Sequence, residues 1–181
     1  MQSFFNLNFY GGNFLNIVLL EPEIPYNAGA IGRTCLATGA TLHLIRPLGF
    51  DISERAVRRA GLDYWKHVDV CDYDDYESFL NANENMGEMF YATTKALHSY
   101  TDVNYSPNCY IIFGKESAGI PEEILVKNRD KCIRIPMLDE MRSLNLSVSA
   151  GIVLYEALRQ NGFPGLSGAG KLHHLEWVPN L

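Results

Sequence analysis

Short apolar runs alternate along the chain with segments of helical spacing. The first run, residues 16–20, is stopped by Glu21 and Pro22, which is typical of a short buried strand. Similar runs predict strands at residues 41–46, 67–71, 89–94, 109–113 and 132–135, and helical spacing predicts helices at 28–38, 53–65, 74–83, 121–127 and 144–160. Strands that alternate with helices predict an α/β fold, with a mostly parallel sheet flanked by helices.

The chain divides into three parts by this pattern. The alternation spans residues 16–165 of the 181 and predicts a single domain. Residues 1–15 form an N-terminal extension without the basic start and cleavage site of a signal peptide. The turn-rich residues 166–181 are expected to form a tail over the surface. No apolar run approaches the length of a bilayer span, so we expect no membrane partner.

Charge is distributed unevenly along the chain. The formal net charge is −6, and residues 69–88 alone contribute −7, because they hold seven acids and no Lys or Arg. Residues 31–67 carry six basic side chains against three acidic ones. A local basic surface attracts phosphates even on an acidic protein, and a solvated helix face explains the same pattern equally well. The charge distribution therefore neither excludes nor establishes an RNA partner.

Common cofactor, metal and hydrolase motifs are missing. No G-x-G-x-x-G follows the first strand, and no G-x-x-x-x-G-K-[ST] occurs anywhere. The five histidines lack metal-ligand spacing, and no serine lies in a G-x-S-x-G turn, so we expect no metal and no hydrolase triad. The four cysteines lie far apart without a C-x-x-C pair, which favours buried reduced thiols in a cytoplasmic protein.

Three polar loops that follow predicted strands are the remaining candidates for a site. In the first, Asn27 is expected to cap a helix, Gly29 and Gly32 leave room for close backbone approach, and Arg33 lies on the loop-facing side of that helix. An ordinary cap and a surface charge explain Asn27 and Arg33 as well.

The second and third loops are equally ambiguous when taken singly. Gly114 follows a strong strand and suggests close approach to a ligand, and Glu116 is either a ligand partner or a solvated acid. The third loop carries Arg142, Ser143 and Asn145, of which the last two are also simple candidates for capping the long helix. Three such loops at strand ends of one small α/β domain favour a site.

Together the loops resemble the three sequence motifs of the SPOUT methyltransferases. The similarity extends to their small group of tRNA (cytidine/uridine-34)-2′-O-methyltransferases and covers residues 16–165. The matching motifs are N-x-G-x-x-x-R at Asn27, Gly29 and Arg33, F-G-x-E-x-x-G at Phe113, Gly114, Glu116 and Gly119, and a third at Ile135-Pro136-Met137 and Ser143-Leu144-Asn145. Further markers are EPEIP at 21–25, RRAGLDYW at 58–65 and ATTK at 92–95. The chain departs from the pattern at Tyr26, where relatives often have a second proline, and at Lys115, where some have proline.

This resemblance implies a fold, a reaction and partners. It implies a deep C-terminal trefoil knot, a homodimer with composite sites, and 2′-O-methylation of wobble nucleotide 34 in the tRNA anticodon stem-loop, in the cytoplasm. It places S-adenosyl-L-methionine, with S-adenosyl-L-homocysteine as product, against Ala92, Thr93, Gly114, Glu116, Ile135, Met137, Ser143 and Leu144. Arg33, Ser143 and Asn145 are the expected catalytic residues, and Asn27, Arg33 and Arg142 the expected substrate-binding residues. The alternatives are the same chemistry on another RNA, such as rRNA, and a non-enzymatic RNA-binding module.

Overall fold

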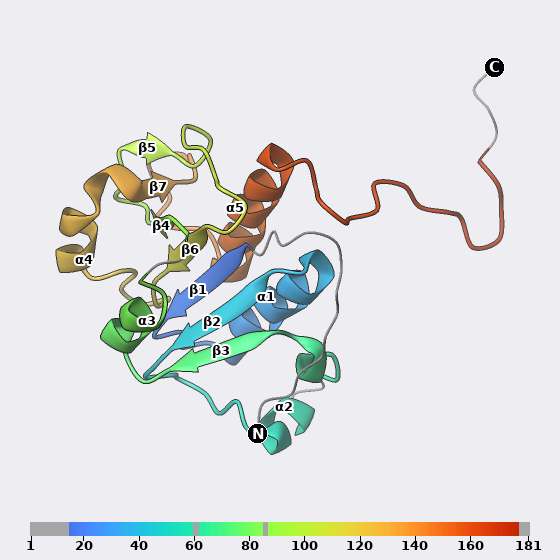
Figure 1. Ribbon diagram of the computed structural model, residues 1–181, viewed down its shortest axis with the longest axis horizontal. Helices are drawn as coiled ribbons and strands as arrows, with labels where there is room; N and C mark the ends of the chain where they lie inside the picture. The colour runs from blue at the N-terminus through green and yellow to red at the C-terminus, as the bar shows by residue number, and fades with distance from the viewer. Residues whose placement is uncertain (1–14, 60–61, 85–86, 178–181) are drawn as a thin grey trace.

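A computed structural model describes residues 15–59, 62–84 and 87–177 (Figure 1). The strands are β1 (Asn16–Leu20), β2 (Thr41–Ile45), β3 (Val70–Tyr73), β4 (Met89–Ala92), β5 (His98–Ser99), β6 (Tyr110–Phe113) and β7 (Cys132–Arg134). The helices are α1 (Pro25–Thr38), α2 (Glu54–Arg59), α3 (Tyr76–Ala82), α4 (Glu122–Lys127) and α5 (Leu146–Gln160), with short 3-10 turns at η1 (Trp65–His67) and η2 (Arg129–Lys131).

The strands of the described residues form one parallel sheet in the order β3-β2-β1-β6-β4-β7-β5. Leu19 of β1 lies beside Leu44 of β2 and Phe113 of β6, and Ala92 of β4 lies beside Phe113 and Ile133. Because the strands are parallel, the carboxyl ends of β4, β6 and β7 lie at one edge of the sheet, where their loops meet. The predicted α/β class and parallel sheet are confirmed.

Helices cover both faces of this sheet (Figure 1). One apolar cluster joins α1 and α5 to the sheet and includes Ile31, Cys35, Val153 and Leu154, all at most 1% exposed. The other packs α3 and α4 on the opposite face and includes Phe79 and Leu125. Because helices cover both faces of the sheet, every residue of β1 and β2 is buried, including the polar Asn16, Thr41 and His43.

Several predicted boundaries are wrong for identifiable reasons. Helix α1 begins at Pro25, earlier than expected, because proline is well placed in a first helical turn. The helix expected over 53–65 ends at Arg59 and is followed by η1, and the two-residue β5 was missed because so short a strand leaves no periodicity. The other predicted strands and helices are present, with ends shifted by a few residues.

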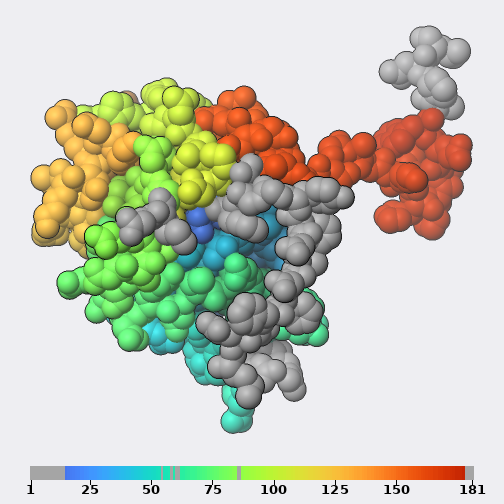
Figure 2. Space-filling view, viewed as in Figure 1, coloured from blue at the N-terminus to red at the C-terminus, as the bar shows by residue number. Residues whose placement is uncertain are grey.

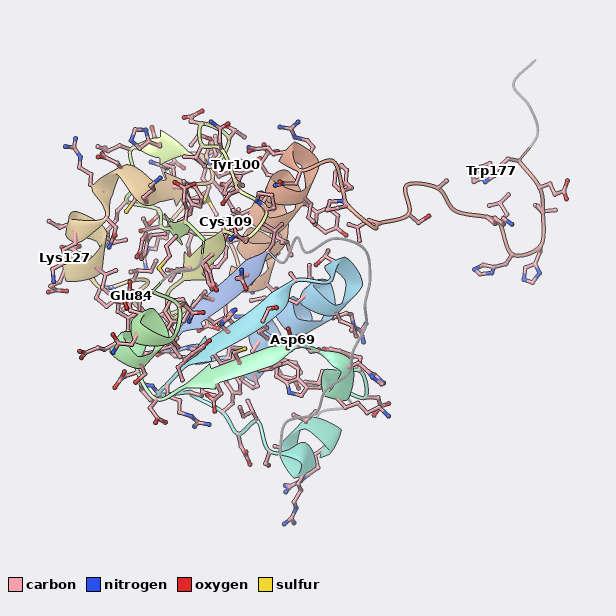
Figure 3. The ribbon with its side chains drawn as sticks, in the orientation of Figure 1. Asp69, Glu84, Tyr100, Cys109, Lys127 and Trp177 are labelled. Atoms are coloured by element: carbon pink, nitrogen blue, oxygen red, sulfur yellow. The ribbon has the colours of Figure 1, made fainter. Side chains whose placement is uncertain are left out.

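The C-terminal segment also differs from expectation. Asn161 and Leu166, just after α5, still contact the domain, but residues 167–177 run away from it instead of over its surface, as Figures 1 and 2 show. Trp177, labelled in Figure 3, lies on this segment and is 74% exposed. The N-terminal extension lies outside the described residues except for Leu15. All four cysteines are free, and Cys35, Cys109 and Cys132 are buried, as the sequence predicted.

His43 of β2 forms the centre of a buried polar network. The Asn16 amide nitrogen donates to main-chain oxygens, so its Oδ1 accepts from His43 Nε2 at 3.0 Å. The Tyr73 hydroxyl then donates to His43 Nδ1 at 3.0 Å. Neutral histidine satisfies both contacts, and burial lowers the pKa of His43 to about 4.

We therefore expect the protein to lose stability in mild acid. The unfolded chain binds a proton near pH 6.5 and the folded His43 only near pH 4, so the free energy of unfolding falls as pH drops between these values. A shift of this size corresponds to about 3 kcal/mol. Urea unfolding across this pH range measures the loss. His43→Gln should flatten the curve and His98→Gln, at an exposed position, should not; equal curves for all three proteins would contradict the assignment.

Candidate active site

A cavity of about 490 Å³ lies where the loops after β4, β6 and β7 meet. All eight residues expected to bind the cofactor line it, and Asn27, Arg142 and Asn145 line it as well. These residues come from the loops after β4, β6 and β7 and, for Asn27, from the first turn of α1, and the parallel sheet places these segments at one edge. The structure thus brings together every predicted site residue except Arg33.

Glu116 ties the second loop to the first. Its carboxylate accepts hydrogen bonds from the main-chain nitrogens of Glu23, at 2.8 Å, and Ile24, at 3.2 Å, and from Asn27 Nδ2, at 2.8 Å. Burial raises the pKa of Glu116, but the hydrogen bonds from Asn27 and from these main-chain groups outweigh it and hold the pKa below its usual value. Glu116 is therefore ionised at neutral pH and acts as an anchor rather than as a proton donor.

Asn27 and Asn145 extend this network to the third loop. Asn145 Nδ2 donates to Asn27 Oδ1 at 3.0 Å, and Asn145 Oδ1 caps α5 by accepting from the nitrogens of Ser147 and Val148. The expected cap at Asn145 is confirmed. The expected cap at Asn27 is wrong, since Ile24 is the N-cap of α1 and Asn27 lies inside the helix, joining Glu116 to Asn145.

Two further contacts clamp the same loops. Lys115 Nζ and Glu21 Oε2 form an ion pair at 2.7 Å, and the Glu23 carboxylate accepts from both the main-chain nitrogen and the hydroxyl of Ser117 at 2.8 Å. Lys115 thus joins the second loop to the EPEIP segment by an ion pair. The loop after β6 is held at three successive positions.

Arg33 lies elsewhere on α1. Its side chain is exposed and outside the cavity, with the guanidinium carbon 4.6 Å from the centre of the Tyr64 ring. The expectation that Arg33 faces the loops of its own chain is wrong. Arg33 lies six residues after Asn27, so its side chain points about 120° away from that of Asn27 around the axis of α1.

Gly29 and Gly32 make room for side chains rather than for a ligand. A Cβ on Gly32 would lie 2.7 Å from Trp65 Cζ3, and one on Gly29 would lie 3.2 Å from Leu62 Cδ1. Tyr64 also donates its hydroxyl proton to the Gly29 carbonyl at 2.8 Å. Sequence reasoning did not assign Tyr64 and Trp65 to the site, although RRAGLDYW was the available signal.

The cavity suits S-adenosyl-L-methionine by size and lining. Its volume lies within the usual range of roughly 300 to 1,000 Å³ for small-molecule sites. Ile133, Ile135, Met137, Leu144 and Val153 supply apolar wall for an adenine ring, and Thr93 and Ser143 supply polar groups. A cofactor without phosphates needs no glycine-rich phosphate loop, which agrees with the missing motifs.

Glu116→Gln tests whether the Glu116 carboxylate anchors the loops that line the cofactor cavity. The amide is nearly isosteric, but its NH₂ would face donors that now bind an oxygen, so one hydrogen bond is replaced by an unfavourable contact. We expect cofactor affinity to fall about 30-fold, corresponding to about 2 kcal/mol. Calorimetric titration of the cofactor measures this. Glu122→Gln, at an exposed ion pair with Lys95, is the matched control and should bind normally; equal affinities would exclude an anchoring role for Glu116.

The described part of the chain offers neither a metal site nor a membrane span. No group of three or more His, Cys, Asp or Glu side chains there is arranged to hold a metal ion. Among the same residues, no helix has the length and apolar character needed to cross a membrane.

Comparisons with known proteins agree with these motifs. Residues 14–155 match the profile of the SpoU rRNA methylase family. The tRNA (cytidine(34)-2′-O)-methyltransferase of Escherichia coli strain K12 is 47% identical over 152 residues, covering 83% of this chain and 96% of the relative. A solved structure described as giving insights into 2-OH methylation of C/U34 on tRNA is 44% identical, with a TM-score of 0.77 and coverage of 84% and 99%.

A more distant solved structure completes the comparison. The AdoMet-bound rRNA methyltransferase of Sinorhizobium meliloti is 26% identical, with a TM-score of 0.71, and the match covers 82% of this chain but 57% of that one. The three motifs, the cavity that they build and the profile match over most of the chain agree. The chain belongs to the SpoU rRNA methylase family.

Proposed function

We propose that this protein transfers a methyl group from S-adenosyl-L-methionine to the 2′-hydroxyl of nucleotide 34, cytidine or modified uridine, in tRNA. The observation that carries the proposal is the single cavity lined by all eight predicted cofactor residues. The E. coli relative and the solved structure on C/U34 methylation support the choice of substrate, since the match spans nearly their whole lengths.

The reaction demands alignment more than chemistry from the protein. A sulfonium-bound methyl group is already activated, so what remains is to present the ribose hydroxyl in line with it. Glu116, Asn27 and Asn145 hold the cavity loops in fixed relation. Ser143 and Asn145 orient the nucleotide, and Arg142 and Asn27 contact it. Arginine is protonated at neutral pH, so Arg33 places the phosphate or ribose and polarises the hydroxyl rather than accepting its proton.

Methylation of another RNA is the second candidate. The rRNA methyltransferase similarity favours it, but this chain matches little more than half of that protein. The tRNA enzymes match over nearly their whole length, which favours the anticodon stem-loop. A non-enzymatic RNA-binding module would have no use for the cofactor cavity.

Three further features belong to the proposal. The chain after β7 is threaded through a loop as a trefoil knot, and two copies form a homodimer with composite sites. Exposed apolar side chains around the third loop and α5 support the dimer: Leu138, Met141, Leu144, Val148 and Tyr155. The enzyme acts in the cytoplasm, where its tRNA substrate and its free thiols are expected.

If the protein is a dimer, its mass in solution should be twice that of the chain, and a substitution in the interface should reduce it to that of a monomer. Sedimentation should give about twice the 20.4 kDa of the chain. Val148 is 51% exposed on α5, so Val148→Asp should bury a charge at the interface and yield monomers without unfolding the domain. Val126→Asp, exposed on α4, is the control that should remain dimeric. A monomeric wild-type protein would contradict the dimer.

Labelled methyl transfer tests the function directly. The protein is incubated with methyl-labelled S-adenosyl-L-methionine and either total tRNA or ribosomal RNA from cells that lack the modification, and the labelled nucleotide is mapped. We expect label on the 2′-oxygen of nucleotide 34 of tRNA. Label in ribosomal RNA alone would favour the second candidate, and cofactor binding without any transfer would contradict both.

A further inference from the structure

Tyr64 is the residue that contacts the Arg33 side chain. The Arg33 guanidinium carbon lies 4.6 Å from the centre of its ring, which is the geometry of a cation–π contact. Within the described residues, no hydrogen bond or ion pair involves the Arg33 guanidinium. The ring face is therefore the contact that orients this long side chain.

A ring face holds an arginine without using its hydrogen-bond donors. A carboxylate partner would engage two of the five N–H groups and neutralise the charge. A tyrosine face attracts the cation from one side and leaves the edge of the guanidinium plane open. Those edge donors are the groups that recognise a phosphate or a ribose oxygen. The arrangement thus orients the cation and keeps it available.

Tyr64 is itself fixed on the same helix. Its hydroxyl donates to the Gly29 carbonyl at 2.8 Å, and this carbonyl is also the α-helical acceptor for the Arg33 main-chain nitrogen. Leu62 and Trp65, which flank Tyr64 in sequence, pack where Cβ atoms on Gly29 and Gly32 would lie. The segment 62–65 and the turn of α1 that carries Arg33 are consequently one packed unit.

We infer that Tyr64 is a positioning residue for methyl transfer, which acts by holding the Arg33 guanidinium in the orientation that engages the target nucleotide. This inference rests on the proposed function and on the role of Arg33 in it. It also gives Gly29 and Gly32 of the first loop a function, since each makes room for the segment that carries Tyr64. Holding the side chain before the RNA binds reduces the rotamer freedom lost in the complex.

Two substitutions separate the ring from its hydroxyl. Tyr64→Leu removes the ring face and should lower kcat/KM for tRNA about 10-fold, the upper part of the range for a cation–π contact. Tyr64→Phe keeps the face and should stay within about 2-fold of wild type. Lysine has no planar guanidinium to orient, so in an Arg33→Lys background Tyr64→Leu should lower kcat/KM for tRNA by about 2-fold or less. Cofactor affinity should be unchanged in all of them.

A spectroscopic readout reports the contact independently of activity. The Arg33 Nε–H resonance should show a ring-current shift in wild type and Tyr64→Phe, and lose it in Tyr64→Leu. Tyr76→Leu is the matched control, because Tyr76 is also half-buried with a hydrogen-bonded hydroxyl but belongs to α3, on the opposite face of the sheet from α1. Should Tyr64→Leu fail to fold, Tyr64→Met removes the ring with less loss of volume.

The possible results distinguish the inference from the function. Three results would each overturn the inference while leaving the methyltransferase assignment intact. They are full turnover by Tyr64→Leu, an Arg33 Nε–H resonance that is unchanged in Tyr64→Leu, and an equal loss of turnover in the Tyr76→Leu control. Failure of wild type to methylate any RNA would instead overturn the proposed function, and with it the role of Tyr64.

Discussion

Replacing Arg33 by alanine is expected to abolish methyl transfer while leaving cofactor affinity nearly intact. Arg33 lies outside the cavity that is lined by the eight predicted cofactor residues, so its removal should not disturb cofactor binding. It supplies the cation assigned to the target phosphate or ribose, and loss of such a preorganised group typically costs about 100- to 1,000-fold in rate. Single-turnover methyl transfer and calorimetric cofactor titration measure the two quantities separately.

Arg46→Ala is the control for the loss of a positive charge. Arg46 belongs to the same basic stretch of sequence but is paired with Asp72 at 2.7 Å on the sheet edge, so its removal should change turnover little. Near-normal turnover by Arg33→Ala, or an equal loss in Arg46→Ala, would remove Arg33 from the proposed mechanism.

Mixed dimers test whether Arg33 acts on the partner's cavity. One chain carries Arg33→Ala and the other carries Glu116→Ala, so that each has one defect. If Arg33 acts across the dimer, one of the two composite sites in each mixed dimer is intact and activity returns on mixing. If it acts within its own chain, both sites stay defective and mixing restores nothing.

The sequence predicted the sheet and the three loops better than the contacts between them. Buried strands such as β1 and β6 are visible because parallel strands are apolar on both faces. Asn145 was placed correctly at the start of α5 because capping is local, whereas Ser143 precedes the cap and does not cap the helix. The link from Asn27 to Asn145 joins residues far apart in the chain, and no local pattern carries it.

Arg33 and Tyr64 illustrate the same limit at the site. Helical periodicity gives the direction of Arg33 relative to its own helix, but not which segment packs against it. Tyr64 reaches Arg33 because Gly29 and Gly32 leave space on α1. Glycine at both positions was visible in the sequence, whereas the occupant of the space was not.

Gly114→Ala is expected to destroy cofactor binding. Gly114 follows β6 directly and is buried, and an added Cβ would overlap the carbonyl group of Gly119 and the main-chain nitrogen of Ile120. Main chain moves aside less readily than the end of a flexible side chain, so the loop from Lys115 to Gly119 must shift. Because this loop carries Glu116 and lines the cavity, we expect at least about 100-fold weaker cofactor binding, corresponding to about 2.7 kcal/mol.

Gly119→Ala separates this steric overlap from backbone strain in the same loop. Gly119 has a φ of +73°, and a Cβ there would meet nothing within 4 Å. Alanine at this φ costs about 1 to 2 kcal/mol, so the variant should melt at a lower temperature yet bind the cofactor within several-fold of wild type. Thermal unfolding with and without S-adenosyl-L-homocysteine measures both effects, since a ligand that binds only the folded state raises the melting temperature. Gly114→Ala should lose that rise and Gly119→Ala should keep it. A rise of wild-type size in Gly114→Ala would mean that the close approach of Gly114 to Gly119 does not shape the cofactor cavity.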